Sequence, residues 1–127
     1  MHKLILIIED EVDIAKTIRY SLEGEGYDVV IAGRGEEGLE KAKQHKPDLV
    51  ILDLRLPRLQ GEEVCKEIRK DEQIAKTPII MLTSKDAEAD RIIGKVVGAN
   101  VYMTKPFDLD KLSAKIKELV GPSEGLS

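Results

Sequence analysis

Five apolar runs of strand length alternate along the chain with segments of helical periodicity, and this alternation restricts the fold more than any other feature of the sequence. It is typical of an α/β domain with a mainly parallel sheet. The runs are continuously apolar, which predicts helices on both faces of the sheet. We expect strands near 3–8, 27–32, 48–53, 78–83 and 100–104, and helices near 12–24, 36–45, 61–71, 87–98 and 108–120.

Length and charge exclude several classes of protein. At 127 residues and 42% hydrophobic content, the chain predicts one domain over 1–120, followed by a flexible tail or truncated linker over 121–127. The 24 acidic and 20 basic residues are scattered and give a net charge of -4. Because phosphate binding needs a basic patch, we expect no direct contact with nucleic acid.

Cysteine content and hydropathy indicate the compartment. Cys65 is the single cysteine, so an intrachain disulfide is impossible and a reduced intracellular setting is favoured. No apolar run approaches the roughly 20 residues of a membrane span, and the N-terminus has no signal-peptide pattern. We therefore expect a cytoplasmic protein without a membrane segment.

Acidic residues follow two of the expected strands. Glu9 and Asp10 come directly after the first apolar run, and Asp53 ends the third. The carboxyl ends of parallel strands open onto one crevice, so these side chains can converge. Crowded carboxylates repel each other unless a cation relieves them, and oxygen ligands suit Mg²⁺, or Mn²⁺ in its place. The sequence therefore predicts a divalent-metal site. Capping of the following helix is the alternative explanation for the acidic run.

Asp53 is either a further metal ligand or a nucleophile. A carboxylate can attack a phosphoryl group when cations neutralise the oxygens in transfer, and Lys105 follows the fifth apolar run. Pro106 allows a cis peptide bond that would fix where the lysine points. Thr83 ends the fourth run, where its hydroxyl could donate to a phosphoryl oxygen or cap the next helix. In isolation, Lys105 could equally be a solvated charge beside a turn.

Taken together, these positions resemble the receiver domain of bacterial two-component response regulators, the CheY-like family. The family pattern is an acidic pair after strand 1, a phosphoaccepting Asp after strand 3, Thr or Ser after strand 4 and Lys-Pro after strand 5. An aromatic residue stands three positions before the lysine, as Tyr102 does here. The resemblance covers 1–120 and implies a flavodoxin-like, doubly wound (βα)5 fold with strand order 2-1-3-4-5.

The resemblance also implies a mechanism. Asp53 would accept a phosphoryl group from a sensor histidine kinase, a phosphotransfer protein or a small phosphodonor. Mg²⁺ would be held by Asp10, Asp53 and the backbone carbonyl of Arg55, with Glu9 acting from outside the direct ligands or through water. The chain would thus be no enzyme but a phosphoacceptor that assists its own phosphorylation and dephosphorylation.

The same resemblance implies a readout. Thr83 and Tyr102 would switch together and alter the surface of helix 4, strand 5 and helix 5, which a downstream effector protein or domain reads. Arg55 and Lys85 would tune the rates. Asn100-Val101 replaces a frequent Asp-Asp pair at a surface that allows a phosphorylation-dependent homodimer. Other departures are Glu9 for the usual Asp, Gln60 for Asp and Ser84 for Ala.

Two alternatives remain from the sequence. One is a receiver-like docking module that never becomes phosphorylated. The other is a phosphatase resembling the haloacid dehalogenases, which also form an aspartyl-phosphate with Mg²⁺. That family needs a second Asp two residues after its nucleophile, and Arg55 stands there. The pattern therefore disfavours turnover of external substrates. A flavin site would match the fold class alone, and the chain has one Phe, three Tyr and no Trp to stack on the ring.

Overall fold

The computed structural model describes residues 2–56, 59–84 and 98–122. Lys85 and the helix expected near 87–98, except for its last residue Gly98, lie outside the described residues. The described elements are β1 (Leu4–Ile8), α1 (Val12–Gly24), β2 (Asp28–Ala32), α2 (Gly35–His45), β3 (Leu49–Asp53), α3 (Gly61–Lys70), β4 (Ile79–Ser84), β5 (Val101–Lys105) and α5 (Leu109–Val120).

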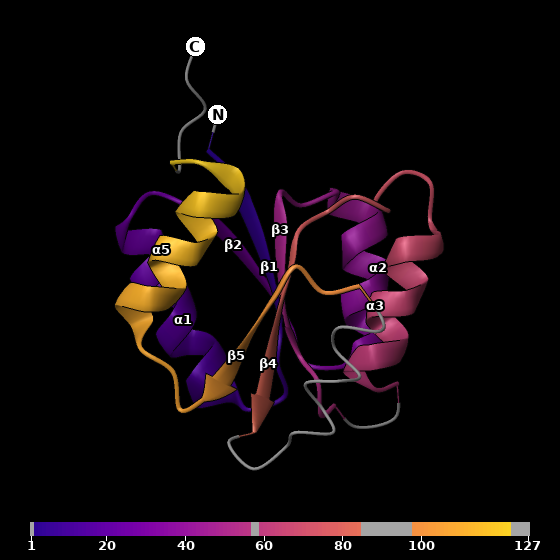
Figure 1. Ribbon diagram of the computed structural model, residues 1–127, viewed down its shortest axis with the longest axis horizontal. Coiled ribbons are helices and arrows are strands. Elements are labelled where there is room, and N and C mark those ends of the chain that lie inside the picture. The colour runs from indigo at the N-terminus through magenta and orange to yellow at the C-terminus, as the bar shows by residue number, and fades with distance from the viewer. Residues whose placement is uncertain (1, 57–58, 85–97, 123–127) are drawn as a thin grey trace.

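The five strands form one sheet in the order β2-β1-β3-β4-β5, and each adjacent pair is parallel. The predicted fold class and strand order are confirmed. Figure 1 shows α1 and α5 on one side of the sheet and α2 and α3 on the other. The strand arrowheads of β4 and β5 point to the same end of the molecule, away from the labelled chain termini. We call the end at the arrowheads the carboxyl edge and the opposite end the amino edge.

The core consists of two apolar layers, because successive residues of each strand face opposite sides of the sheet. Leu6, Val50 and Met81 pack toward α2 and α3 with Ala42 and Ile68. The neighbouring strand residues pack on the other face against α1 and α5; this second layer includes Ile7, Leu49, Ile51, Ile80, Ile18 and Ile116. Burial on both faces explains why the strands are continuously apolar. Cys65 lies in the first layer, fully buried on α3, as expected for a small apolar residue.

Arg69 organises the amino edge. Its guanidinium donates five hydrogen bonds of 2.7 to 3.0 Å, to the carbonyl oxygens of Ala75, Thr77 and Gly98 and to Oδ1 of Asn100. Asn100 Oδ1 also accepts from the backbone N–H of Ile79 at 2.8 Å. A helix, the start of β4 and the approach to β5 are therefore joined by one side chain.

A second connection at the same edge joins α1, β2 and α5. Glu25, just after α1, accepts a 2.6 Å hydrogen bond from the Ser113 hydroxyl and lies 2.9 Å from Lys117 Nζ. The hydroxyl of the buried Tyr27 donates to the carbonyl oxygen of Gly121 at 3.1 Å. The end of α5 is thus fixed to the turn between α1 and β2.

None of the helices within the described part of the chain is both long enough and apolar enough to span a bilayer.

Candidate functional site

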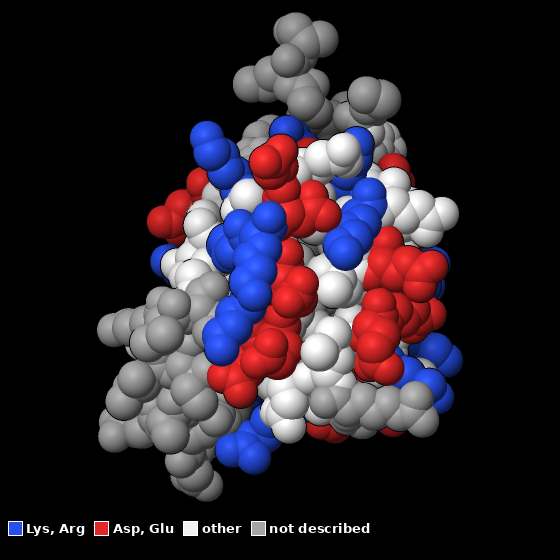
Figure 2. All heavy atoms as spheres, turned by 90° about the vertical axis from the view of Figure 1, so that its right-hand side faces the viewer, with Lys and Arg blue, Asp and Glu red and all other residues white. Residues whose placement is uncertain are grey.

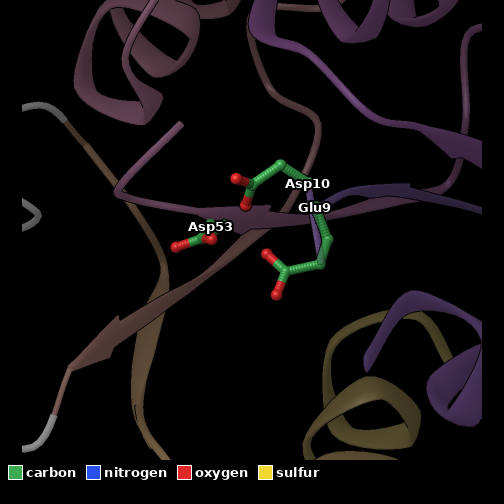
Figure 3. Close-up of side chains that lie close together, drawn as sticks. All are labelled: Glu9, Asp10 and Asp53. Carbon is green, nitrogen blue, oxygen red and sulfur yellow. The ribbon is translucent and has the colours of Figure 1, made fainter. Parts of the chain in front are cut away.

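Glu9 and Asp10 follow the last residue of β1, and Asp53 is the last residue of β3. Because β1 and β3 are paired in parallel, these residues meet at the carboxyl edge. A carboxylate oxygen from each lies within 4.8 Å of the other two (Figure 3). Glu9 is 1% exposed and Asp53 5%, whereas Asp10 is open to solvent. The structure therefore brings together the three acidic residues that the sequence predicted to converge.

The segment after Asp53 folds back on the strand it leaves. The backbone N–H of Arg55 donates to Oδ1 of Asp53 at 3.0 Å, and the backbone N–H of Gly61 donates to the carbonyl oxygen of Leu54 at 2.9 Å. Leu54 and Leu56 are each 4% exposed and belong to the core beneath α2 and α3. The side chain of Arg55 stays exposed. Two buried leucines thus anchor the segment and leave the polar atoms of Asp53 at the crevice.

Lys105 is the last residue of β5, and its peptide bond to Pro106 is cis. Its ammonium lies 2.6 Å from Oε1 of Glu9 and 3.2 Å from Oδ2 of Asp53. Glu11 is a third, more distant partner at 3.7 Å. Glu11 is the N-cap residue of α1, but its side chain forms no capping hydrogen bond. No sequence signal distinguishes an acidic residue that caps a helix from one that faces a lysine 94 positions later.

Burial and neighbouring charges perturb the pKa values of both Glu9 and Lys105. Burial raises the pKa of Glu9 to about 8, and the nearby Asp53 carboxylate adds to this rise while Lys105 opposes it. Burial alone would lower the pKa of Lys105, but its hydrogen bond to Glu9 and the charge of Asp53 outweigh burial and raise it. The interactions with Lys105 do not reverse the rise in the Glu9 pKa, and a cation among the carboxylate oxygens would favour the ionised form of Glu9.

Thr83 and Tyr102 lie on the two neighbouring strands β4 and β5. Thr83 is 1% exposed, and its hydroxyl oxygen has no hydrogen-bond partner among the described residues. Thr83 pairs in register with Thr104, one residue before Lys105. Tyr102 is partly buried against the core layer beneath α2 and α3. An unpartnered buried hydroxyl is costly, which favours a ligand that it contacts in another state.

The residues present fit a divalent cation. The cluster offers hard carboxylate oxygens from Glu9, Asp10 and Asp53, the donors that Mg²⁺ prefers. Oε2 of Glu9 is buried and accepts no hydrogen bond from any described group. A buried carboxylate oxygen without a donor is the group that a cation would satisfy.

A cavity of about 320 Å³ adjoins Lys105 on the side of α1 and α5. It is lined by Asp13, Ile14, Thr17, Lys105, Pro106, Phe107 and Leu109. No sequence pattern predicts this cavity, because it arises where the loop after β5 meets the first turns of α1.

Comparisons with known proteins agree with this geometry. The family model described as the response regulator receiver domain matches residues 5–117. The Bacillus subtilis alkaline phosphatase synthesis transcriptional regulatory protein PhoP is 48% identical over 124 residues, which are 98% of this chain and 51% of that protein. This chain therefore spans about half the length of that relative.

Solved structures give the same result. The Vibrio cholerae chemotaxis protein CheY4 is 31% identical, with a TM-score of 0.87 over 94% of this chain and 99% of that one. The receiver domain of the Pseudomonas aeruginosa sensor histidine kinase PA1611 is 30% identical, with a TM-score of 0.88 over 95% and 99% of the two chains. That structure has a magnesium ion coordinated in its active-site cleft. This chain belongs to the response regulator receiver domain family of two-component signalling proteins.

Proposed function

We propose that this chain is a phosphorylation-activated signalling switch in which Asp53 accepts the phosphoryl group. The observation that carries the proposal is the placement of the Asp53 carboxylate. It ends β3, is almost completely buried and has the Lys105 ammonium 3.2 Å from one oxygen. A carboxylate can attack phosphorus when nearby cations neutralise the oxygens of the group in transfer.

The transfer is an exchange of bonds at phosphorus. An oxygen of Asp53 forms a bond to phosphorus while the bond from phosphorus to the donor breaks. The donor is a phosphohistidine of a sensor histidine kinase or phosphotransfer protein, or a small acyl phosphate. The leaving nitrogen or oxygen keeps the electron pair of the broken bond. Lys105 then pairs with an oxygen of the group now attached to Asp53.

Asp10, Asp53 and the backbone carbonyl of Arg55 would hold Mg²⁺, or Mn²⁺, with Glu9 acting through water or from outside the direct ligands. The bound ion supplies charge neutralisation to the oxygens in transfer. Arg55, exposed beside Asp53, would modulate the rates of transfer and hydrolysis. We assign the same role to Lys85, which lies outside the described residues.

The readout would pass through Thr83 and Tyr102. The unpartnered hydroxyl of Thr83 can donate to a phosphoryl oxygen, and its movement would allow Tyr102 on the adjacent strand to turn inward. The surface of β5, α5 and the helix expected near 87–98 would then change and be read by a downstream effector protein or domain. The same surface would serve a phosphorylation-dependent homodimer.

We expect no direct contact between this stretch of chain and nucleic acid. On the face formed by α2 and α3, acidic and basic side chains lie side by side (Figure 2). Lys66 pairs with Glu63 and Lys70 with Glu67 on α3. Such mixed charge does not provide the basic patch that phosphate backbones require.

The test is intact-mass measurement after incubation with acetyl phosphate, with and without Mg²⁺. We expect a Mg²⁺-dependent gain of one phosphoryl group that is absent in Asp53→Asn. The matched control is Asp110→Asn, an exposed aspartate in the first turn of α5, which should label like the unsubstituted chain. Labelling of Asp53→Asn would disprove the assignment. No labelling of any variant by acetyl phosphate or by a phosphohistidine donor would favour a docking module that is never phosphorylated.

A further inference from the structure

The segment that follows Asp53 lies against the first residue of α2. Gly35 is buried at this helix start. A Cβ built on Gly35 would lie well under 3.0 Å from the carbonyl oxygen of Leu59, and 3.0 Å from both the carbonyl carbon and the Cβ of Leu59. The obstructing atoms are mainly backbone, so no rotation of a side chain would relieve the contact. Any residue other than glycine at position 35 must therefore displace one of the two backbones.

The segment is equally confined where it enters α3. A Cβ on Gly61 would meet the carbonyl oxygen of Asp53 and would lie 2.7 Å from Cα of Leu54. Between these two glycine contacts, Leu54 and Leu56 are buried and Leu59 is partly buried against the same core layer. The described backbone after Asp53, over 54–56 and 59–61, is thus confined by α2, α3 and the core.

We propose that Gly35 is a positioning residue for the phosphoacceptor. By letting the backbone near Leu59 lie against α2, it sets where the Asp53 carboxylate and the Arg55 carbonyl stand relative to Glu9 and Asp10. The inference rests on the proposed role of Asp53 and adds a requirement from a helix that contributes none of the reacting groups.

In Gly35→Ala we expect the backbone near Leu59 to move, rather than the first turn of α2. The start of α2 is fixed by the hydrogen bond from the Gly38 N–H to the Arg34 carbonyl at 2.9 Å, and Glu37 accepts from the Gly33 N–H at 2.9 Å. Movement at Leu59 would be transmitted toward Asp53 through Gly61, whose N–H donates to the carbonyl oxygen of Leu54 at 2.9 Å. Misplacing a reacting group by roughly 1 Å can cost about 10²-fold in rate.

Gly33 provides a matched control two positions away in the same turn. A Cβ on Gly33 meets no atom within 4 Å, and an alanine there retains the N–H that bonds to Glu37. We would compare Gly35→Ala with Gly33→Ala for Mn²⁺ affinity, measured from the electron paramagnetic resonance signal of free Mn²⁺, and for the rate of phosphoryl uptake from acetyl phosphate. Urea unfolding of each variant would show that both measurements are made on folded protein.

We expect Gly35→Ala to remain folded, to bind Mn²⁺ about 10-fold or more weakly and to accept phosphoryl groups more slowly by a similar factor. Gly33→Ala should match the unsubstituted chain in both. Equal behaviour of the two variants would overturn this inference and leave the role of Asp53 intact. Loss of folding in Gly35→Ala would overturn it too, because Gly35 would then be required for folding and not for the position of Asp53. If the unsubstituted chain neither binds Mn²⁺ nor takes up a phosphoryl group, the proposed function fails as well.

Discussion

At the amino edge of the sheet, the Arg69 guanidinium is matched by acceptors on every side, and five hydrogen bonds join α3 to the approaches of β4 and β5. At the carboxyl edge, three carboxylates share one ammonium, and Glu9 Oε2 and Thr83 Oγ1 are buried without a partner among the described residues. Buried polar groups stabilise a fold when satisfied and cost free energy when they are not. The hydrogen bonds at the amino edge therefore stabilise the fold, whereas the carboxyl edge has buried polar atoms that a bound ligand could satisfy.

Substitution of Lys105 by Met tests the carboxyl edge and should have the largest effect. Loss of the ammonium beside Asp53 should slow phosphoryl uptake from acetyl phosphate by about 10²-fold or more. The Mn²⁺ affinity should rise, because Glu9 and Asp53 would no longer be paired with an ammonium. The rate would be followed by intact mass, with Lys111→Met on the exposed side of α5 as control. An unchanged rate would remove Lys105 from the mechanism.

Substitution of Arg69 by Met tests the amino edge. Removing five hydrogen bonds, two of them part-buried and three exposed, should lower the free energy of unfolding by about 2 kcal/mol. Urea denaturation would measure the change. Lys66→Met on the same helix is the control, because it removes only an exposed ion pair with Glu63 at 3.7 Å, which should contribute little to stability. Mn²⁺ affinity should not change while the protein is folded. A weakened metal site would show that the two edges are not independent.

Gly38 tests how tightly the approach to Glu9 is packed. A Cβ there would lie 2.5 Å from Cδ1 of Ile8, the residue before Glu9. Gly38→Ala gains about 1 kcal/mol in helix propensity, but overpacking against Ile8 should more than offset this. The same Cβ would lie 2.7 and 2.8 Å from Cγ1 and Cγ2 of Ile8. Ile8→Ala removes all three of these atoms, so it should cost about 1 kcal/mol less in Gly38→Ala than in the unsubstituted chain. A double-mutant cycle by urea unfolding measures the coupling. Simple additivity would show that the helix, not Ile8, adjusts.

Substitution of Glu25 should have the smallest effect on the free energy of unfolding, and this effect should depend on pH. The hydrogen bond from Ser113, aided by Lys117, outweighs burial and lowers the pKa of Glu25 from its ordinary value of 4.5. A lowered folded-state pKa stabilises the fold above the unfolded-state pKa, and this stabilisation is lost as pH falls through the folded-state pKa. Glu25→Gln should therefore cost up to about 1 kcal/mol near neutral pH and little in strong acid.

Urea unfolding at the two pH values measures the Glu25 effect, with the exposed Glu118→Gln as control. A cost that does not diminish in acid would mean that hydrogen bonding of a neutral side chain, rather than the carboxylate charge, holds Glu25 in place.

Much of the carboxyl edge could be predicted because its geometry follows from topology. Once the apolar runs are assigned to parallel strands, the residues after them must meet at one edge, whatever their separation in sequence. The helix from Val12 to Gly24 was predicted at its observed bounds, and the remaining described elements differ by one residue at one end or, for β4 and β5, at both ends. Strand β5 runs one residue further than expected and includes Lys105. The roles of Asp53, Thr83 and Lys105 stay predictions.

The amino edge could not be predicted in the same way. Arg69 lies in a helix with Lys66, Glu67 and Lys70 around it, and the sequence does not distinguish it from these solvent-facing charges. Four of its five hydrogen bonds go to backbone carbonyls, whose direction depends on how the turns after α3 and before β5 are packed. The same applies to Gly35, because the need for glycine arises from a backbone 24 residues away. Tertiary contacts of this kind leave no periodic pattern.

The hydrogen bond from Tyr27 to the Gly121 carbonyl has a practical consequence for experiments on this chain. It fastens the end of α5 at the amino edge, the end of the molecule that is remote from Asp53 (Figure 1). A fluorophore or a surface tether joined at Pro122 would therefore leave the crevice open to phosphodonors. Single-molecule or immobilised assays with a label at Pro122 could therefore follow the switch without blocking phosphoryl transfer to Asp53.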